Sequence, residues 1–331
     1  MHMTNLKLPH RRQFLHLAVG AAGLPFAPHV ARAQAYPTRP VRIFVGYPPG
    51  GAADTITRIM AQWLSDRFGQ AFVIENRPGA ATNLSIQAAL TSPPDGYSLV
   101  YIGTTVTINA TLYESSGVNF LRDGSAVGGL VTFPHVIAAH PSLPANNVAE
   151  LVAFARSNPG KISMASYGTG TTSHLAGELF KSMANVNFVH VPYRGDAQAI
   201  PDLLSGRVQI YFATLTGTIS QIRSGALRAL AVLDKTRYSA LPDVPAVGEF
   251  VPGYEVESIA GFGVRKDTPQ EIIKRLHTEI NAGLASSGIK ARFAELGAIP
   301  LPISPAEFQA SLVAQTEKWS KVIRVANIKP E

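Results

Sequence analysis

The stretch VRIFVGYPPGGAADTITRIMAQWL, residues 41–64, contains the junction that decides the fold. Its largely apolar start, 41–45, predicts a strand, and after Asp54 the apolar residues recur at helical spacing. Two prolines and two glycines, 48–51, lie between them. The resulting strand, tight loop and helix N-terminus would point several unpaired N–H groups and the positive end of a helix dipole at one place. Such a junction suits an anion, and it is also compatible with a plain turn.

The same alternation of strand-like and helix-like segments continues from residue 36 to the end of the chain. It predicts parallel sheets covered by helices, an α/β fold. The expected strands are 41–46, 71–75, 97–103, 162–167, 186–191, 207–212 and 228–233. The expected helices are 54–67, 83–91, 148–157, 173–184, 196–205, 269–285 and 305–326. This length fits two lobes, with crossings near 132–134 and 253–254, or a single larger sheet.

Residues 1–35 have the composition of an export signal. Arg11 and Arg12 precede an apolar run that is too short to span a membrane and is broken by Pro25. Small-residue cleavage patterns follow at 31–33 and 33–35, so we expect cleavage near residues 33–35. The arginine pair suits the twin-arginine route, although a general secretory signal also begins with basic residues.

Composition narrows the class of the mature protein. The chain has 46% apolar and 15% charged residues, which is typical of a soluble globular protein. Its net charge of +7 falls to +3 once the four basic and no acidic residues of 1–35 are removed, and mild basicity suits small acidic ligands better than nucleic acid. The absence of cysteine excludes a disulfide, a thiolate nucleophile and a lipid anchor, so we expect a free periplasmic protein.

The motifs of the common enzyme classes are absent. The sequence has no G-x-S-x-G elbow, phosphate loop, H-E-x-x-H pair or dinucleotide fingerprint, and its histidines lack metal-ligand spacing. We expect no enzyme activity, metal or cofactor, although a Ser/His/Asp triad could still assemble from distant positions. No helix-turn-helix or stacking-aromatic pattern indicates nucleic-acid binding.

Three strand-to-helix loops are candidates for a ligand site, since such sites gather at the carboxyl ends of parallel strands. They are the loop at 47–54, the loop before the helix at 173–184, and the segment YRGD at 193–196. Each also has a structural explanation: Thr and Ser cap helices, Asp54 can pair with Arg58 four residues on, and a histidine in a first turn can simply pack.

The mature chain also resembles a known family, and several segments carry the resemblance. They are YPTRPVRIFVGYPPGGAADTITRIMAQWLSDRFGQAFVIENRPGA, SPPDGYSLV, GTGTTSHLAGELFKSMA, VHVPYRGDAQAIPDLLSGRV and LRALAVLDKTRYSALPDVPAVGE. In this order they are similar to the Bug, or TctC-like, solute receptors, which are the extracytoplasmic binding proteins of tripartite tricarboxylate transporters. The similarity covers nearly all of the chain after residue 35.

This resemblance implies a two-lobe periplasmic binding protein fold with the ligand enclosed in a cleft. Lobe 1 would comprise 36–133 plus 255–331, and lobe 2 would comprise 134–254. A monomer would bind a small carboxylate, such as a di- or tricarboxylate, an aromatic acid or an acidic amino acid, and deliver it to the membrane subunits of a transporter. Backbone groups would hold the carboxylate, with glycines allowing its approach. The site residues implied are Tyr47, Pro48, Pro49, Gly50, Gly51, Ala52, Ala53, Asp54, Thr104, Thr105, Thr169, Gly170, Thr171, Thr172, Ser173, His174, Arg194, Gly195, Asp196 and Thr214.

The chain departs from the family pattern around the expected cleft. Residues 76–85 read NRPGAATNLS where NRPGAGGNIG is frequent, Asp196 stands where a small residue such as Ser is common, and Ala213-Thr214 replaces an acidic residue followed by Asn. Ligand identity therefore does not transfer from the family. A sensor that presents the same ligand to a signalling partner, or less readily a secreted hydrolase, remains an alternative function.

Overall fold

The computed structural model describes residues 36–330, and the expected export signal at 1–35 lies outside them. Contacts divide the chain into two units, Met1–Thr38 and Arg39–Glu331, and every helix and strand of the described residues belongs to the second. Within these residues no helix is both long and apolar enough to cross a membrane.

Two mixed sheets form the framework. The first sheet has the strand order β11-β4-β10-β3-β1-β2, and the second has the order β7-β6-β8-β5-β9. The strands are β1 Val41–Val45, β2 Phe72–Asn76, β3 Ser98–Gly103, β4 Gly124–Thr132, β5 His135–Ala139, β6 Ser163–Ser166, β7 Val189–Pro192, β8 Ile210–Thr214, β9 Arg228–Val232, β10 Ile259–Arg265 and β11 Ile299–Pro300.

Most strands of each sheet run in the same direction. In the first sheet β1 to β4 run together, and only β10 and β11 are reversed. In the second sheet only β5 is reversed. The expected α/β class with mostly parallel strands is therefore confirmed, and the alternative of one larger sheet is wrong.

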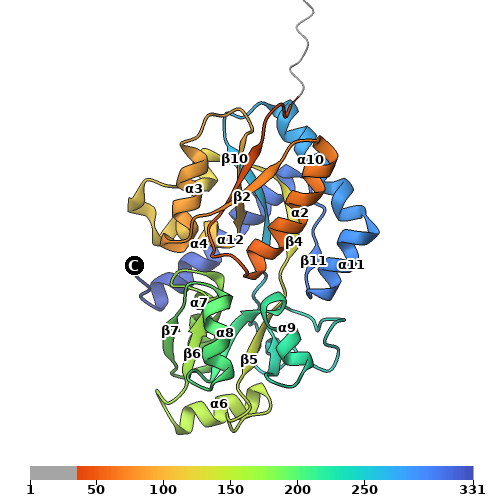
Figure 1. Ribbon diagram of the computed structural model, residues 1–331. Coiled ribbons are helices and arrows are strands. Elements are labelled where there is room, and N and C mark those ends of the chain that lie inside the picture. The colour runs from red at the N-terminus through yellow and green to blue at the C-terminus, as the bar shows by residue number, and fades with distance from the viewer. Residues whose placement is uncertain (1–35, 331) are drawn as a thin grey trace, which may run out of the picture. The chain divides into compact units, whose positions relative to one another are not determined.

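Helices pack against both sheets. They are α2 Ala52–Phe68, α3 Asn83–Leu90, α4 Thr105–Leu112, α5 Phe120–Asp123, α6 Val148–Ser157, α7 Thr172–Ala184, α8 Asp196–Leu204, α9 Leu215–Arg223, α10 Gln270–Ala285, α11 Ser287–Glu295 and α12 Pro305–Val325, with short 3-10 turns at Ala80–Thr82, Glu114–Ser116 and Val247–Glu249. In Figure 1, α2, α10 and α11 lie together beside the first sheet, and α6, α8 and α9 lie beside the second.

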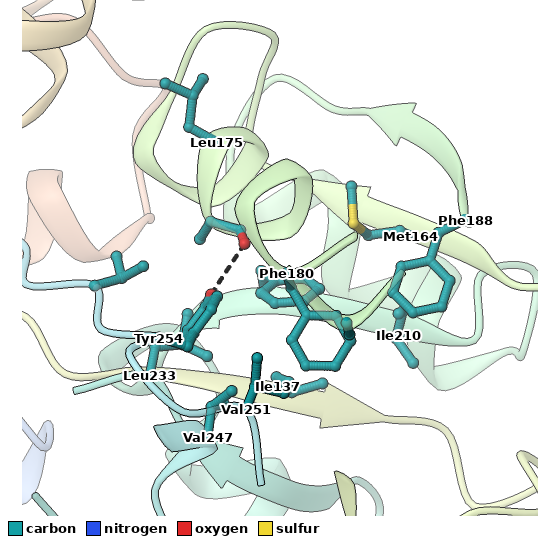
Figure 2. Close-up of a cluster of buried hydrophobic side chains, with 14 of the residues drawn as sticks. Ile137, Met164, Leu175, Phe180, Phe188, Ile210, Leu233, Val247, Val251 and Tyr254 are labelled. Carbon is teal, nitrogen blue, oxygen red and sulfur yellow. Dashed lines mark hydrogen bonds between the residues drawn. The ribbon is translucent and has the colours of Figure 1, made fainter. Parts of the chain in front are cut away.

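A large hydrophobic cluster that includes several aromatic rings fills the interior beside the second sheet (Figure 2). The ring of Phe180 on α7 lies 6.0 Å from Phe188 and 5.9 Å from Tyr254, the latter edge to face. The hydroxyl of Tyr254 donates to the carbonyl of Ala176 at 2.9 Å, so the cluster leaves this buried polar atom satisfied.

The sequence patterns missed the strands β4, β5, β10 and β11, and for two of them the composition gives the reason. β4, GSAVGGLVT, and β10, IAGFGVR, contain glycines that resemble turn signals, yet the backbones here are too close for side chains. A Cβ on Gly261 would lie 2.1 Å from the carbonyl oxygen of Gly128. The missed helices include α4, TVTINATL, whose β-branched residues favour strands, and also α5, α9 and α11.

The chain passes between the sheets at two places. Phe133 and Pro134 connect β4 to β5, and the N–H of Phe133 donates to the carbonyl of Ser258 just before β10. The two crossing segments are therefore hydrogen-bonded to each other. The lobe boundaries expected from the sequence stay a prediction.

Candidate ligand-binding site

The residues that carry the family-like motifs surround a cavity of about 50 Å³. Segments that follow strands of both sheets contribute to it. Expected site residues that line it are Tyr47, Pro48, Gly51, Ala52, Ala53, Thr104, Thr105, Thr172, Arg194, Gly195, Asp196 and Thr214. Expected site residues that do not line it are Pro49, Gly50, Asp54, Thr169, Gly170, Thr171, Ser173 and His174.

The loop between β1 and α2 is held in shape by Asp54. This buried carboxylate accepts hydrogen bonds from the N–H of Gly50 at 2.9 Å, from Arg58 at 2.8 Å and from Asn76 at 2.9 Å. Burial alone would raise its pKa, but these donors outweigh burial and leave the pKa of Asp54 below its usual value. The side chain thus orders the loop and does not face the cavity.

The two loop glycines have different roles. Gly50 has φ +85, which favours glycine, whereas Gly51 has φ −80 and an extended conformation open to any residue. Gly51 caps α2 and lines the cavity, and a Cβ there would meet nothing closer than 3.9 Å. The backbone conformation therefore requires glycine at position 50. At position 51 the absence of a side chain leaves the cavity open.

Donor groups at the start of α7 are hydrogen-bonded to Tyr167. The Thr172 hydroxyl and the Ser173 N–H both donate to the Tyr167 oxygen. The Tyr167 hydroxyl in turn donates to Nε2 of His135 at 3.1 Å, since Nδ1 of that ring donates to the carbonyl of Phe133. Burial lowers the pKa of His135 to about 4, which keeps the imidazole neutral.

The other polar side chains near the start of α7 point away from the cavity. The Ser173 hydroxyl donates to the carbonyl of Phe212, and the Thr171 hydroxyl donates to the carbonyl of Gly168. His174 accepts the N–H of Gly170 and stacks on the ring of His190. Thr169 and Thr171 line a neighbouring groove of about 370 Å³ instead.

Asp196 begins α8 and is the buried acid of the cavity wall. The Tyr211 hydroxyl donates to it at 2.5 Å, the Thr214 hydroxyl lies 3.4 Å away, and the N–H of Ala52 at the start of α2 also donates. Burial raises the pKa of Asp196, and these three donors offset part of that rise. The carboxylate thus uses an α2 donor that a ligand carboxylate was expected to use.

Five helix N-termini converge on this cavity. Gly51, Thr104, Thr171, Gly195 and Thr214 are the N-caps of α2, α4, α7, α8 and α9, and each helix contributes its cap or its first residue to the wall. Helix N-termini carry partial positive charge and unpaired N–H groups. Their convergence favours a negative group inside.

Sequence reasoning missed an aromatic part of the wall. The missed lining residues are Tyr101, Gly103, Phe133, Tyr167, Ala197, Ser258 and Ile259. The ring of Tyr47 packs edge to face on Tyr101 and Tyr167, at 6.2 and 6.0 Å. Burial raises the pKa of Tyr47 to about 12, although the Thr105 hydroxyl bonded to it acts against that rise. The position of Tyr101 near the carboxyl end of a predicted strand was the available signal.

Among residues 36–330, no histidine lines this cavity. Ser166 and His190 are hydrogen-bonded at 2.7 Å, but neither lines the cavity, and the ring of His190 stacks on that of His174. Burial lowers the pKa of His190 to about 3. Within residues 36–330 no cluster of His, Cys, Asp and Glu could hold a metal.

Comparison with known proteins gives a family and several relatives. The model of the tripartite tricarboxylate transporter family receptor, TctC, matches residues 56–328. Protein BugT of Bordetella pertussis is 32% identical over 302 residues, covering 90% of this chain and 92% of BugT.

Solved structures of similar proteins have a similar fold. R. palustris Rpa4515, solved with adipate, is 34% identical with a TM-score of 0.85 over 89% of this chain and 100% of that one. The periplasmic binding protein BugD is 32% identical with a TM-score of 0.84 over 89% and 99% of the two chains.

Proposed function

The chain belongs to the tripartite tricarboxylate transporter receptor family, and from that premise we propose that it captures a small carboxylate in the periplasm and delivers it to the membrane subunits of such a transporter. The convergence of five helix N-termini on one small cavity carries the proposal. Adipate in the related R. palustris protein is consistent with it.

The binding residues follow from the wall of the cavity. The N–H groups at the start of α2 around Gly51 and Ala53, the hydroxyl of Tyr101 and the exposed guanidinium of Arg194 donate to no other group of residues 36–330, and they surround the space. Neutral donors and one cation would replace the water around a carboxylate, which is costly to bury alone. The other expected residues belong to the proposed site as well, and those that do not line the cavity hold its loops in shape.

The remaining features belong to the same proposal. The protein acts as a monomeric receptor without catalysis, after its signal is cleaved near residues 33–35. Lobe 1 comprises 36–133 plus 255–331, and lobe 2 comprises 134–254, with the ligand held in the cleft between them.

A thermal-shift screen against mono-, di- and tricarboxylates, aromatic acids and amino acids tests this function. A ligand present at about 100 times its dissociation constant stabilises the folded state by about 2.7 kcal/mol. We expect at least one carboxylate to raise the melting temperature by several degrees, and its methyl ester or amide, as matched controls, to have no effect. A shift produced by no carboxylate, or chemical turnover of the ligand, would contradict the receptor function.

A further inference from the structure

Asp196 is the one acidic side chain that residues 36–330 place in the cavity wall, and only 7% of it is exposed. Its hydrogen-bond donors, Tyr211, Thr214 and the N–H of Ala52, are neutral groups. It forms no ion pair with any residue of 36–330. A buried carboxylate without a cation is costly, even where helix N-termini compensate part of its charge.

This charge restricts what can bind beside it. A ligand carboxylate facing Asp196 would place two like charges in a space from which most water is excluded, and like charges there repel strongly. A positively charged ligand group would instead pair with Asp196, and the pairing would compensate both charged groups for the water they lose. The group next to Asp196 should therefore be a cationic hydrogen-bond donor.

The neighbouring aromatic rings favour the same group. Tyr47, Tyr101 and Tyr167 line the cavity, and the charge of Asp196 raises the pKa of all three, although less than burial does. The faces of such rings attract an ammonium. Arg194, the other charged residue of the wall, is exposed and lies two residues before Asp196.

We propose that the ligand of this receptor is an amino carboxylate, whose ammonium group binds Asp196 among the tyrosine rings and whose carboxylate is held by the free donors and Arg194. The inference rests on the proposed function and narrows its ligand class. Asp196 is a specificity-determining residue that selects an amino acid over the dicarboxylate of the same length.

Calorimetry with matched ligand pairs tests this selection. The pairs are succinate with γ-aminobutyrate and glutarate with δ-aminovalerate, in which an aminomethyl group replaces one carboxylate, and glutarate with glutamate, in which an ammonium group is added to the diacid. For at least one pair, the wild-type protein should bind the amino carboxylate at least tenfold more tightly than the diacid. The Asp196→Asn variant should lose that preference. Asp243→Asn removes an exposed acid of similar charge and should keep it.

The outcomes separate this inference from the proposed function. If the wild-type protein prefers the diacid in every pair, or if Asp196→Asn leaves the preference unchanged, the inference is wrong and the carboxylate receptor stands. Diacid binding that strengthens at lower pH only while Asp196 is present would mean that a protonated Asp196 donates to a carboxylate, which also overturns it. If none of these ligands binds but another carboxylate of the screen does, the inference is wrong and the proposed function stands; if no carboxylate of the screen binds, both fail. Asp196→Ser, in which a small hydroxyl replaces the acid, provides a second variant if the Asn variant does not fold.

Discussion

Gly50 and Gly51 are neighbours in one loop, yet only Gly50 adopts a conformation that requires glycine. Two adjacent glycines in a loop predict that at least one occupies a position that needs glycine, but the sequence does not say which. The structure assigns φ +85 to Gly50 and φ −80 to Gly51. The same limit applies to Asp54, for which pairing with Arg58 and binding of a ligand are indistinguishable until its three hydrogen-bond donors are seen.

Gly50→Ala should lower the free energy of unfolding by about 1 to 2 kcal/mol, because an L side chain is unfavourable in the left-handed region. No atom lies within 4 Å of the added Cβ, so the loss would come from conformation alone. Gly51→Ala is the matched control and should leave stability unchanged. Urea unfolding of both variants measures this, and equal losses would contradict the assignment.

His135 should make the protein sensitive to mild acid. Its pKa is about 4 in the folded state, so the unfolded chain takes up a proton near pH 6.5 while the folded protein does not. Stability is therefore complete above about pH 6.5 and falls as the pH decreases toward 4, by roughly 2 to 3 kcal/mol.

Unfolding of wild type and His135→Asn between pH 7 and 4.5 checks this. The variant should show a clearly smaller loss than the wild-type protein, with a residual loss from His190 and His277, whose pKa values burial also lowers. Identical pH profiles would show that His135 does not contribute.

The regular elements differ in how well the sequence predicted them. α2, α6, α7 and α12 agree within two residues with their patterns, because an apolar stripe of helical spacing is a local signal. β4 and β10 were missed because their glycines serve contacts between strands, which no local pattern contains. The site residues were likewise predicted only where the signal is local. The loop before α2 was predicted, whereas Tyr101, Phe133 and Ser258 line the cavity because of how β3, β4 and β10 meet.

Gly261→Ala in β10 should destabilise the protein by at least about 3 kcal/mol, since the new Cβ would lie 2.1 Å from a backbone oxygen of β4. Gly288→Ala near the start of α11 meets no atom within 4 Å and should be neutral or slightly stabilising. Thermal unfolding of the two variants compares them directly. A mild effect of Gly261→Ala would mean that the strands separate more easily than the structure indicates.

One helix joins the interiors of the two sheets. Phe308 and Leu312 of α12 belong to the cluster that includes β1 and β3, whereas Trp319, Val322 and Ile323 belong to the cluster of Figure 2. Sequence periodicity predicted this helix but could not show that its two ends pack in different clusters. Any movement of the sheets relative to each other must therefore also involve α12.

We expect ligand binding to favour a closed arrangement, because the cavity wall draws on segments that follow both sheets. Small-angle scattering with a saturating ligand should show a smaller radius of gyration than without it. The bridging helix α12 should keep that change modest. An unchanged radius at saturation would contradict closure.

The central claim is that a carboxylate-bearing ligand binds in the cavity beside Gly51. Calorimetry of Gly51→Val with the tightest ligand from the screen tests it most directly. The extended backbone at Gly51 accepts valine without strain, and the added methyl groups would occupy part of a cavity of about 50 Å³.

We therefore predict that Gly51→Val unfolds at the wild-type temperature but binds at least a hundredfold more weakly, whereas Gly288→Ala, distant from the cavity wall, binds normally. Wild-type affinity in a folded Gly51→Val protein would show that the ligand binds elsewhere, and would contradict the account.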